Sequence, residues 1–373
     1  MVTRDRFSTQ SGATLHFKLL LSVWLRLLWE NARHITPGKI GRAAAITVAS
    51  AHYSVLNLIQ NALYREGFAE IQLSGSPIFI IGHWRSGTSL LHELLCLDER
   101  HAYANTYACM NPSQFLIAER VMQDVRAAKS SVKRPMDNMT ISLASPQEDE
   151  FALFALGAPS PYAHWIFPAD LESHPEYFDM NNLAPAERER WKSIFLDFFR
   201  KITLSKPGRL VIKSPPHTFR VKLLREMFPD AVFIHIVRDP YVMFASTRHL
   251  LTKMFDLYAL THYRTEATED YIFRTGVNME RLLDAALPTL RPDRYCRIRY
   301  EDLIAAPIEQ VAALYEKLSL GNIEKTLPAI RAYLGRNADY QTNRFDLSRD
   351  EESRISERWR DMILKYGYPL RSA

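Results

Sequence analysis

The stretch Ile78-Phe79-Ile80-Ile81-Gly82-His83-Trp84-Arg85-Ser86-Gly87-Thr88-Ser89 predicts the fold of this chain. Its first four residues form an apolar run behind Pro77, which indicates a buried strand. The following residues have the spacing of a nucleotide phosphate loop, G-x-x-x-x-G-K-[ST], except that Thr88 stands where the lysine is expected. The nearest cation is Arg85, and a leucine stripe after the loop predicts a helix (Leu90, Leu91, Leu94 and Leu95).

A strand, a tight loop and a helix N-terminus together form a site for an anion. Backbone N–H groups and the positive end of the helix dipole point at the bound group. The missing lysine removes the part of the pattern that reaches the outer phosphates of ATP. The stretch therefore predicts a nucleotide-phosphate site that does not work as that of an ATPase does.

The segment R-S-G-T-S behind such a strand resembles the 5′-phosphosulfate loop of sulfotransferases that use 3′-phosphoadenosine 5′-phosphosulfate (PAPS). The resemblance implies transfer of a sulfuryl group without a metal. It also implies which residues hold the 5′-phosphosulfate, with Ser86 completing the turn: Arg85, Gly87, Thr88 and Ser89. A strand–helix turn that binds nothing is the alternative interpretation of the loop alone.

A second apolar run, residues 231–237, is followed by Arg238-Asp239-Pro240 and by a helical stretch that contains Ser246. In the sulfotransferases that it resembles, such an arginine and serine bind the 3′-phosphate of the cofactor. The assignment of Arg238 and Ser246 is chemically sensible, because a guanidinium forks onto phosphate oxygens and a hydroxyl on the next helix can face the same anion. Asp239 and Pro240 have the residue types of a helix cap and first helical position.

A third landmark is Arg299-Tyr300-Glu301-Asp302-Leu303, which directly follows a strand-like stretch at residues 295–298. It resembles a segment that follows a late core strand in the same superfamily. Its direct physical role would be to lead a strand into a capped helix. The three landmarks span residues 75 to 305 in the order that the resemblance requires.

Apolar strands that alternate with helices predict an α/β fold, a P-loop NTPase-like parallel sheet flanked by helices. We expect an N-terminal helical extension over residues 1–70 and a sulfotransferase domain over 71–320. Residues 321–373 are expected to form a C-terminal helical segment that packs on the same domain. The ligand should lie beyond the C-terminal ends of the strands.

The catalytic base has several candidates. Lys213 resembles a strand-end lysine of the family, but Pro215 stands where the family has its histidine, and the histidine follows at His217. The acidic segment Glu148-Asp149-Glu150 resembles an E-D-E segment of bacterial sulfotransferases. Glu148 also fits the last position of a capping box beginning at Ser145, for a helix from there to about Gly157. The sequence thus offers Lys213, His217, Glu148 and Glu150 as catalytic residues without choosing a base.

The 373 residues are 47% hydrophobic and 24% charged, with a formal net charge of +5. This composition suits a soluble protein with an anionic cofactor, and no dense Lys/Arg tract indicates a nucleic-acid partner. Cys96, Cys109 and Cys296 have neither the spacing of metal ligands nor that of a disulfide framework. We expect no metal site and a reducing, cytoplasmic compartment.

The N-terminal section, from Leu15 to Trp29 and from Ala43 to Gln60, is apolar enough to raise the question of a membrane. Lys18 and Arg26 interrupt the first stretch, and neither is a spanning segment or a secretory signal. Helices packed on the protein core are the favoured interpretation. An interfacial helix in peripheral contact with a membrane remains the alternative.

The predicted function is therefore transfer of the sulfuryl group of PAPS to a hydroxyl (or amine) of a small-molecule, lipid or glycan acceptor, with release of PAP, the 3′,5′-bisphosphate. A P-loop kinase is a first alternative, disfavoured by Thr88 in place of the lysine. A non-catalytic nucleotide-binding scaffold is the second.

Overall fold

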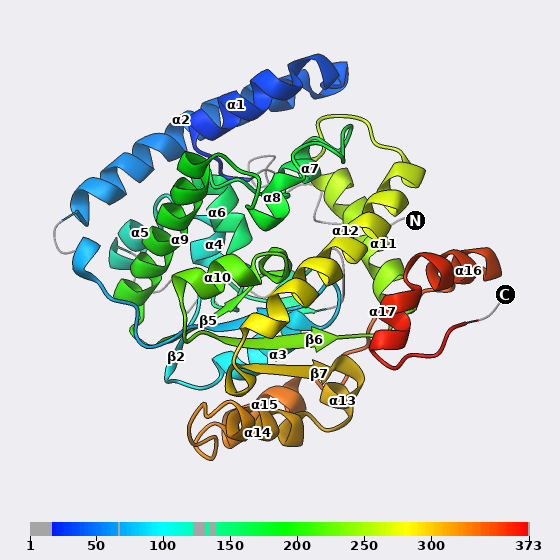
Figure 1. Cartoon of the computed structure of the whole chain (residues 1–373). Coiled ribbons are helices and arrows are strands. Elements are labelled where there is room, and N and C mark those ends of the chain that lie inside the picture. Colours follow the sequence, from blue (N-terminus) through cyan, green and yellow to red (C-terminus); the bar gives the residue numbers. More distant parts are fainter. Residues whose placement is uncertain (1–16, 66–67, 122–131, 135–136, 138, 372–373) are drawn as a thin grey trace, which may run out of the picture.

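The computed structural model describes residues 17–65, 68–121, 132–134, 137 and 139–371 (Figure 1). The predicted α/β fold is confirmed: within this part of the chain, five parallel strands form one sheet in the order β2-β5-β1-β6-β7. The strands are β1 (Ile78–Ile81), β2 (His101–Ala102), β5 (Arg209–Lys213), β6 (Val232–Val237) and β7 (Tyr295–Arg299). Because β1 pairs with both β5 and β6, the phosphate loop leaves from the middle of the sheet.

Both faces of the sheet are covered, as the near-continuous apolar strands require. Phe79 and Ile81 of β1 point into a cluster that includes residues of α4 (Thr106–Met110), α6 (Glu150–Leu156), α9 (Pro185–Ser205) and α10 (Val221–Met227). Ile78 and Ile80 point to the opposite face, into a cluster with α3 (Thr88–Cys96), α13 (Tyr300–Ala305), α14 (Pro307–Lys317) and α15 (Leu327–Arg336). The alternation along β1 thus sorts its side chains between two cores.

A third cluster joins the two ends of the described chain to the middle of the molecule. It contains residues of α1 (Leu21–Asn31), α2 (Ile40–Leu63), α7 (Ala163–Ile166), α11 (Pro240–Tyr258), α12 (Thr265–Ala286), α16 (Arg349–Arg358) and α17 (Arg360–Lys365). In Figure 1, α1 and α2 lie along one outer edge, and α16 and α17 lie beside the end of β6. Residues 1–16 and 66–67 of the predicted N-terminal extension lie outside the described residues.

Shorter elements complete the structure: α5 (Phe115–Val121), α8 (Glu176–Asp179), and an antiparallel pair formed by β3 (Val132–Lys133) and β4 (Thr140–Ile141). Among the described helices, none has the length and apolar character needed to cross a bilayer.

The predicted helix start at Ser145 is wrong. Helix α6 begins at Glu150, and its N-cap residue Asp149 makes no side-chain cap hydrogen bond. Pro146 instead forms a bridge with Asn105, and the Gln147 N–H donates to the Ala104 carbonyl at 2.9 Å. These contacts hold the preceding segment in an extended conformation, so Glu148 is free of the capping role.

Candidate active site

The phosphate loop joins β1 to α3 through backbone conformations that favour glycine. Gly87 has φ +101°, and a Cβ built there would lie 2.3 Å from Cδ2 of Tyr300. Ser86 is buried within the turn, where its hydroxyl donates to the His83 carbonyl at 2.8 Å. The loop is therefore closed by its own side chain and leads directly into the N-terminus of α3, where an anion is favoured.

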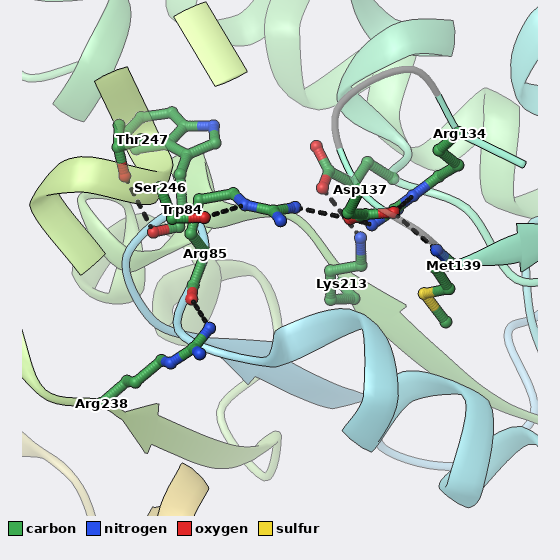
Figure 2. A network of polar contacts seen from close by, with 10 residues as sticks. Trp84, Arg85, Arg134, Asp137, Met139, Lys213, Arg238, Ser246 and Thr247 are labelled. Atoms are coloured by element: carbon green, nitrogen blue, oxygen red, sulfur yellow. Dashed lines mark hydrogen bonds and ion pairs between the residues drawn. The ribbon is translucent and has the colours of Figure 1, made fainter. Parts of the chain in front are cut away.

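The second landmark meets the first. Arg238 follows β6 and donates to the Arg85 carbonyl at 3.1 Å, with its guanidinium stacked 4.3 Å from the Tyr300 ring centroid. The predicted cap at Asp239 is present, since its carboxylate accepts from the Tyr241 N–H at 2.8 Å and α11 begins there. This helix brings the Ser246 hydroxyl to 2.9 Å from Nε of Arg85 (Figure 2).

Arg134 and Asp137 join this group, although the polar, basic sequence of residues 129–138 predicts an exposed loop. Asp137 is 7% exposed and accepts from Arg85 Nη1 at 2.7 Å and from Arg134 Nε at 3.1 Å. Burial opposes ionisation of Asp137, but Arg134 and Arg85 outweigh it and lower the pKa of its carboxyl to about 2. Figure 2 shows the Arg85 side chain stretched between Ser246 and Asp137. A concentrated cationic site is thus present, with one carboxylate inside it.

A cavity of about 440 Å³ lies against these residues. Helix α11 lines it from Ser246 to Leu257, which spans about 16 Å of helix and separates a polar end from an apolar end. The polar end includes the predicted Arg85, Gly87, Thr88, Ser89, Arg238 and Ser246. The apolar end, at the last turns of α11, includes Met254, Leu257 and Tyr258, together with Phe151 and Trp165, whose rings also contact Phe17.

Glu148 also lines the cavity, and two residues hold its carboxylate. Lys213 Nζ, at the end of β5, donates to one oxygen at 2.8 Å, and the Tyr162 hydroxyl donates to the other. Burial alone would raise the pKa of the Glu148 carboxyl, but the Lys213 charge, both hydrogen bonds and Arg134 together lower it below its ordinary value. Glu148 is therefore an ionised carboxylate on the cavity wall at neutral pH.

His217 lies behind that wall. It is fully buried, and its Nε2 is 2.8 Å from the Asp149 carboxylate. The rings of Phe79, Trp191 and Phe195 meet the imidazole edge to face. Neither His217 nor Asp149 is among the residues that line the cavity.

Glu150 is buried in the same way. Its two oxygens accept from Arg220 Nη1 at 2.6 Å and Nη2 at 3.0 Å, and both side chains are fully buried. Ser160 donates to the same carboxylate at 2.6 Å. The three consecutive acids thus pair with Lys213, His217 and Arg220 in turn, and among them only Glu148 lines the cavity.

Glu150→Gln should destabilise the fold strongly, because it leaves the buried Arg220 charge without a carboxylate. Breaking a buried ion pair from one side costs about 3–5 kcal/mol. Urea unfolding measures the loss. The matched control is Glu189→Gln, because Glu189 is an exposed carboxylate paired with the half-buried Lys192 and predicts a change of about 0–1 kcal/mol. Unchanged stability together with a large fall in kcat would instead assign Glu150 to catalysis.

Comparison with known proteins gives the class of this chain. Residues 77–324 match the family model described as the sulfotransferase family. The chain is also 40% identical over 347 residues to omega-hydroxy-beta-dihydromenaquinone-9 sulfotransferase Stf3 of Mycobacterium bovis, covering 93% of this chain and 89% of that protein. The same figures hold for Stf3 of Mycobacterium tuberculosis. The chain therefore belongs to the sulfotransferase family, and it is a sulfotransferase.

Solved structures share the fold. Sulfotransferase STF9 from Mycobacterium avium superposes with a TM-score of 0.69 at 16% identity, covering 95% of this chain and 98% of that one. Sulfotransferase STF1 from Mycobacterium tuberculosis gives 0.63 at 19% identity, over 91% and 90% of the two chains.

Sequence reasoning missed Arg134, Asp137 and Arg220. The sequence contained one weak signal for Arg220. Lys213, His217 and Arg220 follow one another in the chain and give each of the three consecutive acids one basic partner. For Arg134 and Asp137 the sequence contained no such signal, because a stretch with charges of both signs is typical of an exposed loop.

Proposed function

We propose that this sulfotransferase takes its sulfuryl group from PAPS and transfers it to a hydroxyl group on a lipid-like acceptor. One observation carries the proposal: a single cavity has a cationic phosphate-loop end and an apolar end, with the ionised Glu148 on its wall. The cationic end suits the donor, and the apolar end suits the acceptor.

The donor fits the residues at the polar end. The loop from Arg85 to Ser89 offers backbone N–H groups and hydroxyls to the 5′-phosphosulfate, and the closeness of Tyr300 to Gly87 leaves no room for a larger residue in the loop. Arg238 and Ser246 are proposed to bind the 3′-phosphate, since a fork of N–H donors suits phosphate oxygens. Asp137 would compete with these anions for Arg85.

Glu148 is the proposed base. The acceptor oxygen forms a bond to sulfur while the bond between sulfur and the 5′-phosphate oxygen breaks. The acceptor proton passes to Glu148, and the electron pair leaves with PAP. Lys213 and Tyr162 orient the carboxylate, and Lys213 places a positive charge beside the transferred group. We propose supporting roles for His217 and Glu150, because both are fully buried behind the wall.

A lipid acceptor is the proposed substrate class. The apolar end is lined by aromatic and aliphatic side chains, whereas a glycan would need many hydrogen-bonding partners there. The relatives named above act, by their names, on a hydroxylated menaquinone, which is a lipid with a hydroxyl. For the N-terminal helices, contact with a membrane is the alternative that the sequence leaves beside packing on the core.

Transfer of sulfur-35 from labelled PAPS tests the proposal. A long-chain isoprenoid alcohol should be labelled much faster than a sugar alcohol with the same number of hydroxyl groups. Titration with PAP, PAPS and ATP should show a preference for ligands with a 3′-phosphate. Preference for ATP would favour the kinase interpretation, and binding of PAPS without transfer to any acceptor would favour a non-catalytic protein.

Activity should survive treatment with EDTA, because the proposed charge stabilisation comes from Arg85, Lys213 and the loop. In the part of the chain that the structure describes, no group of His, Cys, Asp and Glu side chains has the arrangement of a metal site. The same labelled assay with and without chelator measures this. Loss of transfer that Mg²⁺ restores would contradict the proposal.

We propose the organisation expected from the sequence, with an extension over 1–70, the sulfotransferase domain over 71–320 and a segment over 321–373. The family match over 77–324 supports the middle part. Tyr333, Asn337 and Tyr340 line the cavity, which supports packing of the last segment on that domain. The free, buried state of all three cysteines supports a reducing compartment such as the cytoplasm.

A further inference from the structure

Helix α2 is polar toward the protein and apolar toward the outside. On its inner side, Thr47 accepts from Nε1 of Trp24 at 2.8 Å and Ser54 accepts from the Leu21 N–H at 2.7 Å. The fully buried Gln60 donates to the Pro112 carbonyl at 2.9 Å and accepts from the Leu116 N–H at 3.0 Å. Thr47, Ser54 and Gln60 of the helix are thus used as structural contacts, which reverses the usual pattern of a surface helix.

The outer face of α2 consists of Val48, Val55, Leu58, Ile59 and Leu63. All five are exposed, Val48 at 73% and Leu58 at 69% of their surface. They recur at helical spacing over residues 48–63, about 22 Å of a helix of 24 residues, and the exposed His52 lies among them. Trp29, at the end of α1, is 87% exposed. An exposed stripe of this size, apolar except for His52, indicates a binding surface.

The N-terminal end of α2 is basic. Arg33, Lys39 and Arg42 lie before or within the first turn of the helix, and Glu30 is the nearest acid in sequence. The stretch between Arg42 and Arg65 carries no formal charge, and Arg65 is followed directly by Glu66. Anionic lipid headgroups complement the basic end, and the acyl boundary complements the stripe.

The N-terminal section also forms the outer wall of the apolar end of the cavity. Phe17 packs against Phe151, Trp165 and Tyr258, all of which line the cavity. Arg42, in the first turn of α2, donates to the carbonyl of Leu257, another lining residue, at 2.5 Å. Figure 1 shows α1 and α2 as the outermost elements on their edge of the molecule. A surface that binds the outer face of α2 therefore lies next to the apolar end of the cavity.

We propose that the outer face of α2 binds the surface of an anionic phospholipid bilayer, from which the acceptor enters the apolar end of the cavity. The entry of the acceptor rests on the proposed function, whereas the docking depends only on α2. A second copy of the chain is the weaker candidate for the same face. A second copy would leave the position of this face, beside the apolar end of the cavity, without a role.

Co-sedimentation of the full chain with vesicles tests the docking. Vesicles of phosphatidylcholine with a minor fraction of phosphatidylglycerol should bind the protein, and added salt should weaken the binding. The variant V48S/V55S/L58S/I59S should bind the vesicles at least roughly tenfold more weakly, because it removes apolar area from the contact. The matched control V277S/L364S changes residues that are 51% and 52% exposed on α12 and α17, and it should bind normally.

The charges are tested by R33E/K39E/R65E, which should lose the preference for anionic over neutral vesicles. All variants should keep the melting temperature of the unchanged protein, because the altered side chains lie outside the three core clusters. The serine variant should transfer sulfur-35 normally to a short, water-soluble alcohol and slowly to a hydroxylated lipid in vesicles.

Equal vesicle binding by the unchanged protein and the serine variant would overturn the docking, as would absence of binding. A dimer in light scattering that the serine substitutions convert to a monomer, without vesicle binding, would assign the face to a second copy. Failure of transfer to every acceptor, with vesicle binding intact, would contradict the proposed function and leave the docking standing.

Discussion

Glu148→Gln should lower kcat by about 10²–10⁴-fold, which is the usual contribution of a general base. The amide keeps the size of the side chain and an oxygen for the hydrogen bonds from Lys213 and Tyr162, but it cannot take the acceptor proton. PAP affinity should stay near normal, because the Arg85, Arg238 and Ser246 contacts do not involve Glu148. The labelled transfer assay measures kcat, and calorimetry with PAP measures the affinity.

A pH profile separates catalysis from stability. The Tyr162 hydrogen bond is among the interactions that lower the pKa of Glu148. Tyr162→Phe removes it, so the pKa of Glu148 should rise and the acid limb of kcat should move to higher pH. If Glu148 had only a structural role, the acid limb of kcat would not move. His217→Ala, a variant behind the cavity wall, should keep the profile of the unchanged protein.

If Glu148→Gln keeps near-normal kcat at a normal melting temperature, the base has been assigned to the wrong residue. If it only lowers the melting temperature, the ion pair with Lys213 is structural. A large loss of kcat in His217→Ala with normal stability would return the assignment to the histidine.

Arg238→Ala should weaken PAP binding at least about tenfold, because a hydrogen bond to a charged group contributes about 1.5–3 kcal/mol. Binding of adenosine 5′-phosphosulfate, which lacks the 3′-phosphate, should barely change. Calorimetric titration of both ligands gives the comparison. The selective loss follows from the position of Arg238, which lies at the cavity, stacked on Tyr300, and contacts the loop through the Arg85 carbonyl.

Two controls sharpen this test. Ser246→Ala removes one hydroxyl near the same proposed phosphate and should cause a smaller but equally selective loss, about 0.5–1.5 kcal/mol. Arg85→Ala should weaken both ligands, because Arg85 belongs to the loop and also contacts Ser246. Equal losses for PAP and adenosine 5′-phosphosulfate in Arg238→Ala would rule out the assignment to the 3′-phosphate.

Local sequence patterns predicted the central parts of the fold. The strand, loop and helix at residues 78–96 and the Asp239 cap before α11 involve neighbours in sequence, and their residue types constrain the backbone directly. Parallel order followed from the alternation of apolar strands with helices. The capping box at Ser145 failed because a non-local bridge between Asn105 and Pro146 competes with a local helix start.

The choice among the candidate bases required the tertiary structure. Glu148, Asp149 and Glu150 are equivalent in sequence, and their partners Lys213, His217 and Arg220 lie more than 60 residues away. Which acid faces the cavity depends on how α6 packs against α4 and α9. No local pattern encodes that packing.

The sequence by itself thus determined the class of protein, because the phosphate loop and the strand-end Arg238 are short motifs whose chemistry resides in neighbouring residues. Only the tertiary structure decided that Glu148 lines the cavity, that Asp137 sits among the cations, and that the polar side of α2 turns inward. The physical reason is the same in each case: burial and pairing depend on contacts between distant segments, and these form only when the chain packs.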